Sequence, residues 1–224
     1  MSADHPTAAR MSIGVLGGTG EQGRGLAKRL GRAGHSIVLG SRDAQRAAAA
    51  ADGLQPVRGR LPITGGTNRE AALADLVIVA VPYDGHRELL GGLADQLAGK
   101  IVVDCVNPMQ FGPAGPQMIP VPEGSAAEEA AAVLPGSTIV SAFHDVSARK
   151  LLGKSSSVPT DILICGDDPA ANAVVAGLAA QIRGMRGIEV GPLRLSAVLE
   201  SLTMVLIGVN KRYKTRSGVR ITGV

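Results

Sequence analysis

A glycine-rich turn is the first segment of this sequence that could carry out chemistry. Its residues, which have the spacing G-x-G-x-x-G, are Gly18, Thr19, Gly20, Glu21, Gln22 and Gly23. In a dinucleotide-binding turn of this spacing, Gly18 permits the tight bend, Gly20 lets a pyrophosphate approach, and Gly23 lets the helix pack on the strand. The unpaired N–H groups at the start of that helix face the phosphates. A turn without ligand is the alternative, but the predicted strand, turn and helix favour nucleotide binding.

The end of the second predicted strand determines which nucleotide fits. Proteins that bind NAD usually carry Asp or Glu there, which binds the ribose 2′-hydroxyl. This sequence has Ser41 and Arg42 instead. A hydroxyl and a guanidinium bind the 2′-phosphate that a carboxylate would repel. Arg46 lies one helical turn later and is expected either to add a weaker contact or to face solvent. We therefore expect NADP(H), bound mainly by Ser41 and Arg42.

Alternating strands and helices position these residues. Apolar runs predict strands at residues 12–16, 36–39, 76–81, 101–106, 138–143, 161–165 and 187–190. Helical spacing and capping residues predict helices at residues 22–33, 43–51, 70–74, 84–97, 125–134, 169–183 and 195–210. Because parallel strands need crossovers, the alternation predicts an α/β fold: a Rossmann-type doubly wound parallel sheet with a small C-terminal α/β extension.

Three parts of the chain follow from this pattern. We expect residues 1–10 to form a flexible leader, residues 11–150 an NADP-binding Rossmann domain, and residues 151–224 a small C-terminal part. Residues 65–68 read as a turn. Residues 107–122 contain five prolines and read as a long loop at a strand's carboxyl end, where α/β sheets bind ligands.

Composition excludes several other classes of protein. The 224 residues are 45% apolar and 19% charged, which is sufficient for a packed core. Only four residues are aromatic, so a nucleic acid partner that stacks on rings is not expected. No run reaches the roughly 18 apolar residues of a membrane span. The four histidines show no metal-ligand spacing, and the two cysteines lie in apolar runs, as in a cytoplasmic protein with reduced thiols.

The net charge of +4 is unevenly distributed. Residues 1–150 carry 14 basic and 14 acidic side chains, whereas residues 151–224 carry 9 basic and 5 acidic ones. The basic surplus therefore lies near the C-terminus and would suit an anionic partner.

The sequence also lacks the usual catalytic pairs. It has no G-x-S-x-G elbow, no P-loop and no Tyr-x-x-x-Lys pair. For a nicotinamide enzyme, this absence favours hydride passing directly between two cofactors, with no side chain in acid–base catalysis and with the protein positioning the two rings.

Several segments together resemble one family, the NADPH-dependent F-420 reductases, also called F-420:NADP oxidoreductases. The most specific of these segments are Cys165-Gly166-Asp167-Asp168 and Leu199-Glu200-Ser201-Leu202-Thr203, and others are Gly40-Ser41-Arg42, Ala80-Val81-Pro82 and Ser141-Ala142-Phe143-His144. The likeness runs from about Met11 to Val224. It implies reversible hydride transfer between NADP(H) and the 5-deazaflavin coenzyme F-420. It also implies a homodimer in which the C-terminal part completes the deazaflavin pocket.

The resemblance assigns roles to individual residues. It places Thr19, Ser41, Arg42 and Arg46 at the nucleotide, Pro82 beside the nicotinamide, and His144, Ser201 and Thr203 near the deazaflavin. Val81, which precedes Pro82, is also a cofactor-binding candidate. Asn107 ends a strand at the ligand edge, so its backbone could contact a cofactor. The alternatives are structural: His144 as a satisfied histidine, and Ser201 and Thr203 bonded to helix carbonyls. Ala197 departs from the family pattern, in which arginine is common, although Arg194 lies one helical turn earlier.

Two other functions remain open on the residues alone. One is an NADPH-dependent flavin or ferric reductase on the same scaffold. The other is a non-catalytic NADPH-sensing module.

Overall fold

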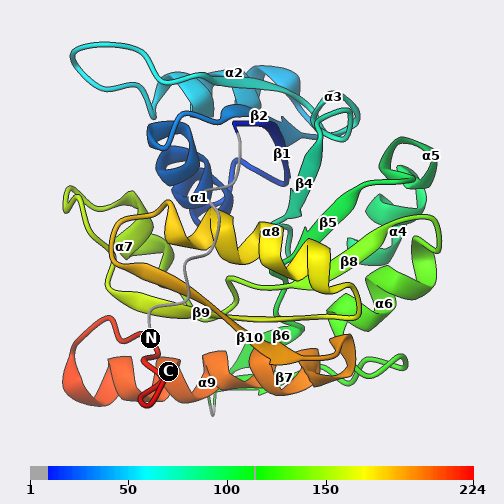
Figure 1. Cartoon of the computed structure of the whole chain (residues 1–224), viewed down its shortest axis with the longest axis vertical. Helices are drawn as coiled ribbons and strands as arrows, with labels where there is room; N and C mark the ends of the chain where they lie inside the picture. The colour runs from blue at the N-terminus through cyan, green and yellow to red at the C-terminus, as the bar shows by residue number, and fades with distance from the viewer. Residues whose placement is uncertain (1–9, 114) are drawn as a thin grey trace.

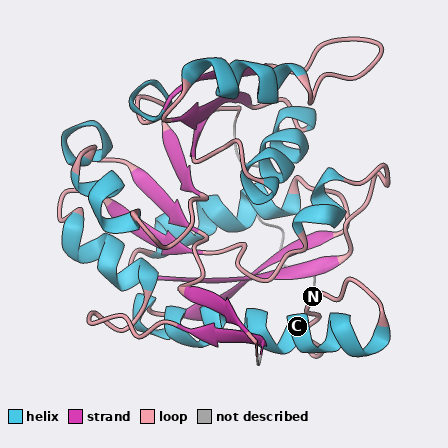
Figure 2. Ribbon diagram, turned by 180° about the vertical axis from the view of Figure 1, so that it is seen from behind, coloured by secondary structure: helices cyan, strands magenta, loops and turns pink. Residues whose placement is uncertain are grey.

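A single eight-stranded sheet forms the centre of the molecule (Figures 1 and 2). The computed structural model describes residues 10–113 and 115–224, so the expected leader lies outside the described residues apart from Arg10. The strand order is β10-β9-β8-β5-β4-β1-β2-β3. The strands of this sheet are β1 (Ser12–Leu16), β2 (Ser36–Ser41), β3 (Ile63–Thr67), β4 (Leu76–Val79), β5 (Ile101–Asp104), β8 (Thr138–Ser141), β9 (Thr160–Gly166) and β10 (Met185–Gly191).

Helices connect the strands and cover both faces of the sheet. They are α1 (Glu21–Arg32), α2 (Ala44–Asp52), α3 (Asn68–Ala71), α4 (His86–Gly91), α5 (Ala94–Leu97), α6 (Ala126–Val133), α7 (Ala148–Leu152), α8 (Pro169–Ala180) and α9 (Ser196–Tyr213). One core cluster packs α1, α7 and α8 on one face, and a second packs α4, α5 and α6 on the other. Strands β1 to β5 and β8 are parallel, as predicted for a Rossmann-type fold.

The C-terminal part extends the same sheet. β9 pairs antiparallel with β8 and parallel with β10. Alternate residues of β9 face opposite ways, so that Ile162 and Ile164 pack in the cluster of α8 while Leu163 and Cys165 pack against Leu199 of α9. The long helix α9 therefore covers the face of β9 opposite α8 (Figure 1).

The turn predicted at residues 65–68 is wrong, because Gly65 and Gly66 lie inside β3. Helix α2 packs so closely that a Cβ at Gly65 would lie 2.1 Å from the carbonyl carbon of Ala47. These glycines therefore serve a close helix–strand contact rather than a turn.

The loop predicted at residues 107–122 is also wrong in part. It contains a two-stranded antiparallel hairpin, β6 (Met109–Gly112) and β7 (Gly115–Met118). Pro116 sits opposite Phe111, and a two-stranded ribbon tolerates proline because each strand has a free edge.

Two helices also differ from the prediction. The single helix predicted at 84–97 is instead α4 and α5, with Gly92 as the C-cap of α4, and α7 was not predicted.

The last described residues are attached to β9 through Asp161. Its fully buried carboxylate forms ion pairs with Arg186 and Arg220 and accepts the backbone N–H of Ile221. The hydrogen bond from Arg186 is the main cause that lowers the pKa of Asp161 to about 2. Arg220 therefore contributes to structure although its side chain is 47% exposed; Lys211, Arg212, Lys214 and Arg216 are exposed as well.

Helix α9 joins the rest of the fold through Glu200. Its buried carboxylate accepts the backbone N–H groups of Ala126 and Ala127 at the start of α6, and burial raises its pKa to about 8.

The stretch Leu193–Tyr213, which contains α9, is long and apolar enough to span a membrane by length and composition, with a mean hydropathy of 1.4. The expected absence of a membrane partner therefore stays a prediction.

Candidate functional site

The glycine-rich turn connects β1 to α1 in a conformation that only glycine adopts easily. Gly17 has a φ of 66°, in the left-handed region. A Cβ at Gly18 would lie 2.7 Å from the side chain of Leu39, and one at Gly23 would lie 2.8 Å from the Cα of Gly18. A Cβ at Gly20 would have its nearest neighbour 3.6 Å away, so this glycine faces open space. The turn is therefore packed tightly against the sheet and open at Gly20.

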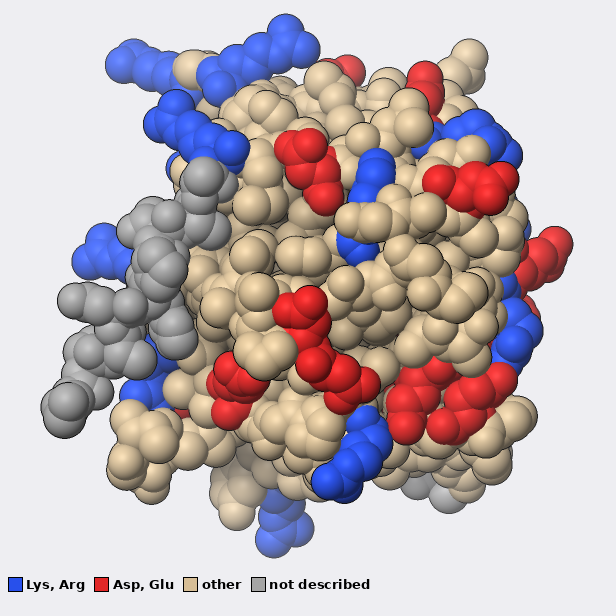
Figure 3. Space-filling model, turned by 45° about the vertical axis from the view of Figure 1, so that its right-hand side comes forward, with Lys and Arg blue, Asp and Glu red and all other residues tan. Residues whose placement is uncertain are grey.

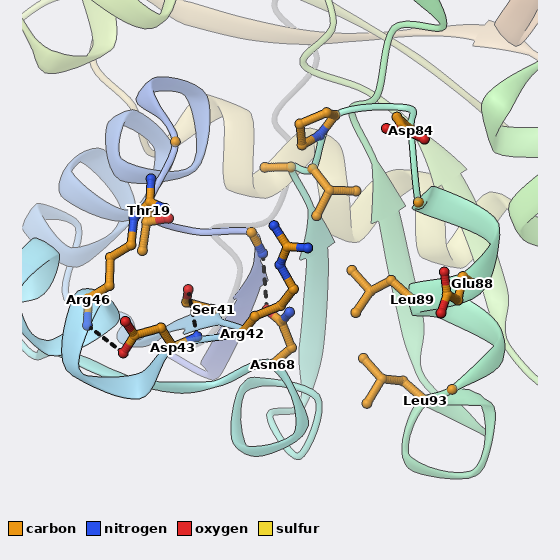
Figure 4. Close-up of a pocket in the computed structure, with 17 residues that line it drawn as sticks. Thr19, Ser41, Arg42, Asp43, Arg46, Asn68, Asp84, Glu88, Leu89 and Leu93 are labelled. Atoms are coloured by element: carbon orange, nitrogen blue, oxygen red, sulfur yellow. Dashed lines mark hydrogen bonds between the residues drawn. The ribbon is translucent and has the colours of Figure 1, made fainter.

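A pocket of about 820 Å³ lies beside this turn, at the carboxyl ends of β1, β2 and β4. Its volume is within the range of about 300–1,000 Å³ that is typical of small-molecule sites. Figure 4 shows Thr19 and Arg46 along one side, and Leu89 of α4 and Leu93, which precedes α5, along the other, with Arg42 reaching between them. The position matches the ligand edge of an open α/β sheet.

Polar and cationic groups gather at the β2 end of this pocket. Ser41 is buried, and Arg42 and Arg46 are exposed to the pocket. Asp43 is the one acid among them, and its carboxylate accepts the N–H groups of Gln45 and Arg46 as the N-cap of α2. Because Asp43 is engaged by the helix, the two guanidinium groups and the Ser41 hydroxyl are the groups available to an anion.

Asn68 is a pocket residue that the sequence analysis missed. Its side-chain oxygen accepts the N–H of Gly17 at 3.2 Å and so holds the glycine-rich turn. The two residues are 51 positions apart, and no local pattern indicates the contact. Asp84 and Glu88 also line the pocket, opposite the arginines, and were not singled out either.

The residues singled out at the turn and after β4 have different surroundings. Val81 and Pro82 line the pocket, as do Thr19 and Gly20. Glu21 is exposed in the first turn of α1. Gln22 points toward the neighbouring loop, where its amide donates to the carbonyl of Phe143 at 2.9 Å. This hydrogen bond joins the glycine-rich turn to the segment that follows β8.

Asn107, His144 and Thr203 come together although they lie far apart in the sequence. The Asn107 amide and the Thr203 hydroxyl both donate to the backbone carbonyl of His144, at 3.3 and 3.1 Å. The ends of β5 and β8 are thereby linked to α9. Ser201 does not share this contact, because its hydroxyl donates to the carbonyl of Ala197 within α9.

His144 lies in a segment with an unusual backbone. Phe143, which precedes it, is fully buried and has a φ of 63°, a conformation that costs a non-glycine residue about 1–3 kcal/mol. Nε2 of His144 bonds the Ser141 hydroxyl at 2.8 Å, whereas Nδ1 is buried without a hydrogen-bond partner. Burial lowers the pKa of His144 to about 4, so the ring is neutral at physiological pH.

A buried charged cluster supports the wall of the pocket, and the sequence analysis missed it. His86, at the start of α4, bonds Asp104 at the end of β5 and Glu129 of α6, both at 2.8 Å. Tyr83 donates to the same Glu129 at 3.1 Å. Burial by itself lowers the pKa of His86, but the hydrogen bonds and charges of Asp104 and Glu129 outweigh it and raise the pKa to about 9. The segment between Pro82 and α4 is thus attached to β5 by an imidazolium between two carboxylates.

Comparisons with known proteins agree with this geometry. A family model described as "NADP oxidoreductase coenzyme F420-dependent" matches residues 12–108. The chain is 39% identical over 222 residues to an "F420-dependent NADP reductase" of Methanothermobacter thermautotrophicus, covering 96% of both chains. It is 40% identical to the protein of the same name from Methanocaldococcus jannaschii, covering 96% of this chain and 99% of that one. The crystal structure of a candidate F420-dependent NADP reductase from Arthrobacter superimposes with a TM-score of 0.81 at 27% identity, covering 95% of this chain and 99% of that one.

The buried cluster predicts a pH-dependent stability. Because the pKa of His86 is raised, its contribution is complete below about pH 6.5, the unfolded value, and is lost as pH rises through about 9. A shift of this size corresponds to about 3 kcal/mol. We expect His86→Asn to lower the free energy of unfolding by about this amount at pH 6 and to flatten its decline between pH 6.5 and 9, as measured by urea denaturation.

A matched control is His35→Asn. His35 is also fully buried, but its partners are the Gln181 amide oxygen and the N–H of Met11 rather than carboxylates. This variant should lose stability and keep the alkaline decline of the wild type. If His86→Asn kept the same decline, the cluster would not be its source.

Proposed function

Because this chain belongs to the family of coenzyme F-420-dependent NADP oxidoreductases, we propose that it catalyses reversible hydride transfer between NADP(H) and the deazaflavin coenzyme F-420. The observation that carries the proposal is the pocket at the carboxyl edge of the sheet, whose β2 end presents Ser41, Arg42 and Arg46 where NAD-specific proteins have an acid. The similarity extends over nearly the whole chain, including the C-terminal part.

The protein's own role in this reaction is to bind and orient. The N–H groups after Gly20 face the pyrophosphate, and Thr19, Ser41, Arg42 and Arg46 bind the adenosine 2′-phosphate end. Glu21, Gln22 and Gly23 complete the turn, while Val81 and Pro82 border the nicotinamide. When both cofactors are bound, they supply the hydride chemistry, so positioning the rings accounts for most of the catalysis.

The second cofactor belongs beside Asn107, His144 and Thr203, at the β8 end of the same edge. In this proposal Asn107 and Thr203 hold the His144 carbonyl and thereby shape the wall that the deazaflavin meets. Ser201 would reach the coenzyme only if its hydroxyl left the Ala197 carbonyl. Residues 151–224 form the small part that completes this pocket next to the NADP-binding part of residues 11–150.

The direct test of the proposal is an assay with purified protein, NADPH and oxidised coenzyme F-420. The visible absorbance of the deazaflavin should bleach, and adding NADP to the reduced coenzyme should restore it. Absence of bleaching, together with turnover of a flavin or ferric chelate, would identify the reductase alternative. NADPH binding without any turnover would identify the sensing module.

Arg42 provides a test of the nucleotide assignment. Arg42→Ala removes a charge-assisted contact worth about 1.5–3 kcal/mol, so the Kd for NADPH should rise about 10- to 100-fold. The Kd for NADH, which lacks the 2′-phosphate, should change little. Isothermal titration calorimetry measures both constants.

The matched control for this prediction is Arg58→Ala. Arg58 is exposed and is not among the residues lining the pocket. Its removal should leave both nucleotide affinities unchanged. Equal weakening of NADPH and NADH by Arg42→Ala would overturn the assignment of Arg42 to the 2′-phosphate.

The proposal includes a homodimer formed through the outer face of α9. Val198 and Val205 are 65% and 59% exposed and lie two helical turns apart, with the partly buried Leu202 between them. A second copy of the same helix would cover this stripe with an equally apolar surface.

The proposal also assigns the protein to the cytoplasm, which fits the two buried free thiols, Cys105 and Cys165.

The proposed dimer can be tested by placing a charged side chain in the apolar stripe of α9. Val205→Glu should shift the sedimentation coefficient from that of a dimer to that of a monomer, because a carboxylate would be buried at the contact. Val57→Glu, in a fully exposed loop position, is the control and should leave the assembly unchanged. A wild-type protein that sediments as a monomer would contradict this part of the proposal.

A further inference from the structure

A second, smaller hollow lies beside His144, at the β8 end of the carboxyl edge. Its volume is about 140 Å³, and its walls are the 144–147 segment, the middle of α9 and Ser217. Pockets that hold a whole small molecule have volumes of about 300–1,000 Å³. The hollow is therefore large enough for one edge of a ring system but not for an entire coenzyme.

Asp145 lines this hollow and is the unusual group in it. The residue is only 7% exposed, and its Oδ2 atom is buried without a hydrogen-bond partner. Within the described parts of the chain, no Lys, Arg or His nitrogen forms an ion pair with it. A buried carboxylate without a partner is costly. Asp145 must therefore be neutral or receive a donor from whatever enters the hollow.

The other groups that face the hollow are uncharged. Ser147, Thr203, Asn210 and Ser217 carry hydroxyl or amide groups, and burial keeps His144 neutral. Asp161 of β9 raises the pKa of Asp145 by its charge, although Asp161 is itself paired with Arg186 and Arg220. Burial is the largest cause; a hydrogen bond from the residue's own backbone N–H opposes it, and the net effect raises the pKa of Asp145 to about 6. His144 and Asp145 are the two titratable groups that line the hollow, and Asp145 is the one whose pKa lies closer to neutral pH.

The balance of the proposed reaction requires a proton in addition to the hydride. Reduction of a 5-deazaflavin forms a C–H bond at C5 with both electrons of the hydride and an N–H bond at N1 with a proton. NADPH supplies the hydride as its C4–H bond breaks, and it supplies no proton. The transfer therefore needs an acid at the ring edge that carries N1.

Resting on the proposed function, the geometry points to Asp145 as the acid that gives this proton to N1 of the deazaflavin. The O–H bond of Asp145 breaks as the N1–H bond forms, and water returns a proton to the carboxylate afterwards. In the opposite direction the carboxylate takes the proton from N1 as hydride leaves C5. A group whose pKa lies near the working pH serves both directions. This assigns a side chain to acid–base catalysis, where the sequence analysis expected none.

The placement of the hollow supports this assignment. His144 and Thr203 line it, and both are residues that the proposed function puts next to the deazaflavin. The Asn107 amide bonds the His144 carbonyl and so links the segment beside the hollow to the end of β5. In the order β8-β5-β4, the hollow after β8 lies two strands from Pro82 after β4, a separation of about 10 Å, which is comparable to the length of a tricyclic ring system.

The experiment compares Asp145→Asn with the wild type in single-turnover reduction of coenzyme F-420 by NADPH. In the wild type the rate should fall as pH rises through about 6, and it should show a solvent deuterium isotope effect. Asp145→Asn should be about 100-fold slower at pH 6, without that inflection and without the isotope effect. Its Kd for NADPH should be unchanged. Asp95→Asn, an exposed acid on α5, is the control and should behave as the wild type.

A binding measurement tests the same residue without turnover. The ionised carboxylate of Asp145 accepts the N1–H of reduced coenzyme F-420, so wild-type affinity should increase as pH rises through about 6. Isothermal titration calorimetry with the reduced coenzyme should show this dependence in the wild type and its absence in Asp145→Asn. Equal pH dependence in both proteins would overturn the inference.

The outcomes separate this inference from the proposed function. Failure of the wild type to bleach the coenzyme would contradict the function itself. Normal bleaching by both proteins, with the same rate and pH profile, would contradict only the role of Asp145. If Asp145→Asn does not fold, Asp145→Glu keeps a carboxyl group and should retain an inflection at a shifted pH, and loss of the inflection would overturn the inference.

Discussion

The direct packing of helices on strand backbones is the constraint on which the rest of this structure depends. A Cβ at Gly14 would lie 1.9 Å from the carbonyl oxygen of Ala71, and one at Gly187 would lie 2.5 Å from the Cα of Ala176. Glycine and alanine at these contacts let helix and sheet approach more closely than larger side chains allow. The abundance of both residues in the sequence is explained as much by this packing as by turns.

Parallel pairing places the carboxyl ends of β2, β1, β4, β5 and β8 along one edge of the sheet. The large pocket lies at the ends of β1, β2 and β4, and the small hollow follows the end of β8. One end of this edge of the sheet therefore presents the guanidinium groups of Arg42 and Arg46, and the other end presents the buried acid Asp145. On the face shown in Figure 3, acidic and basic side chains are interspersed over a largely uncharged surface. The small net charge is therefore consistent with local rather than global attraction of an anionic cofactor.

The buried carboxylates of this protein have different partners. Those with a partner hold elements of the fold together, and the one that lines a hollow is a candidate for a chemical role. Asp161 is paired with two arginines, Glu129 with His86, and Glu200 with the amides at the start of α6. Each of these groups attaches one element to another. Asp145 is the exception among them, because it lines an open hollow and its Oδ2 atom has no partner. A carboxyl group with a perturbed pKa beside a hollow is a candidate for a functional role.

The sequence by itself determined the local features of the molecule. The bounds of β1 and the start of α8 are as predicted, because an apolar run and an Asp–Pro cap act over a few residues. The glycine-rich turn and Ser41 with Arg42 were recognised for the same reason. Only the tertiary structure decided that Gly65 lies in a strand, that His86 lies between two carboxylates, and that Oδ2 of Asp145 is left without a hydrogen-bond partner. These features depend on contacts between distant segments, and neither propensity nor periodicity carries information about which segments meet.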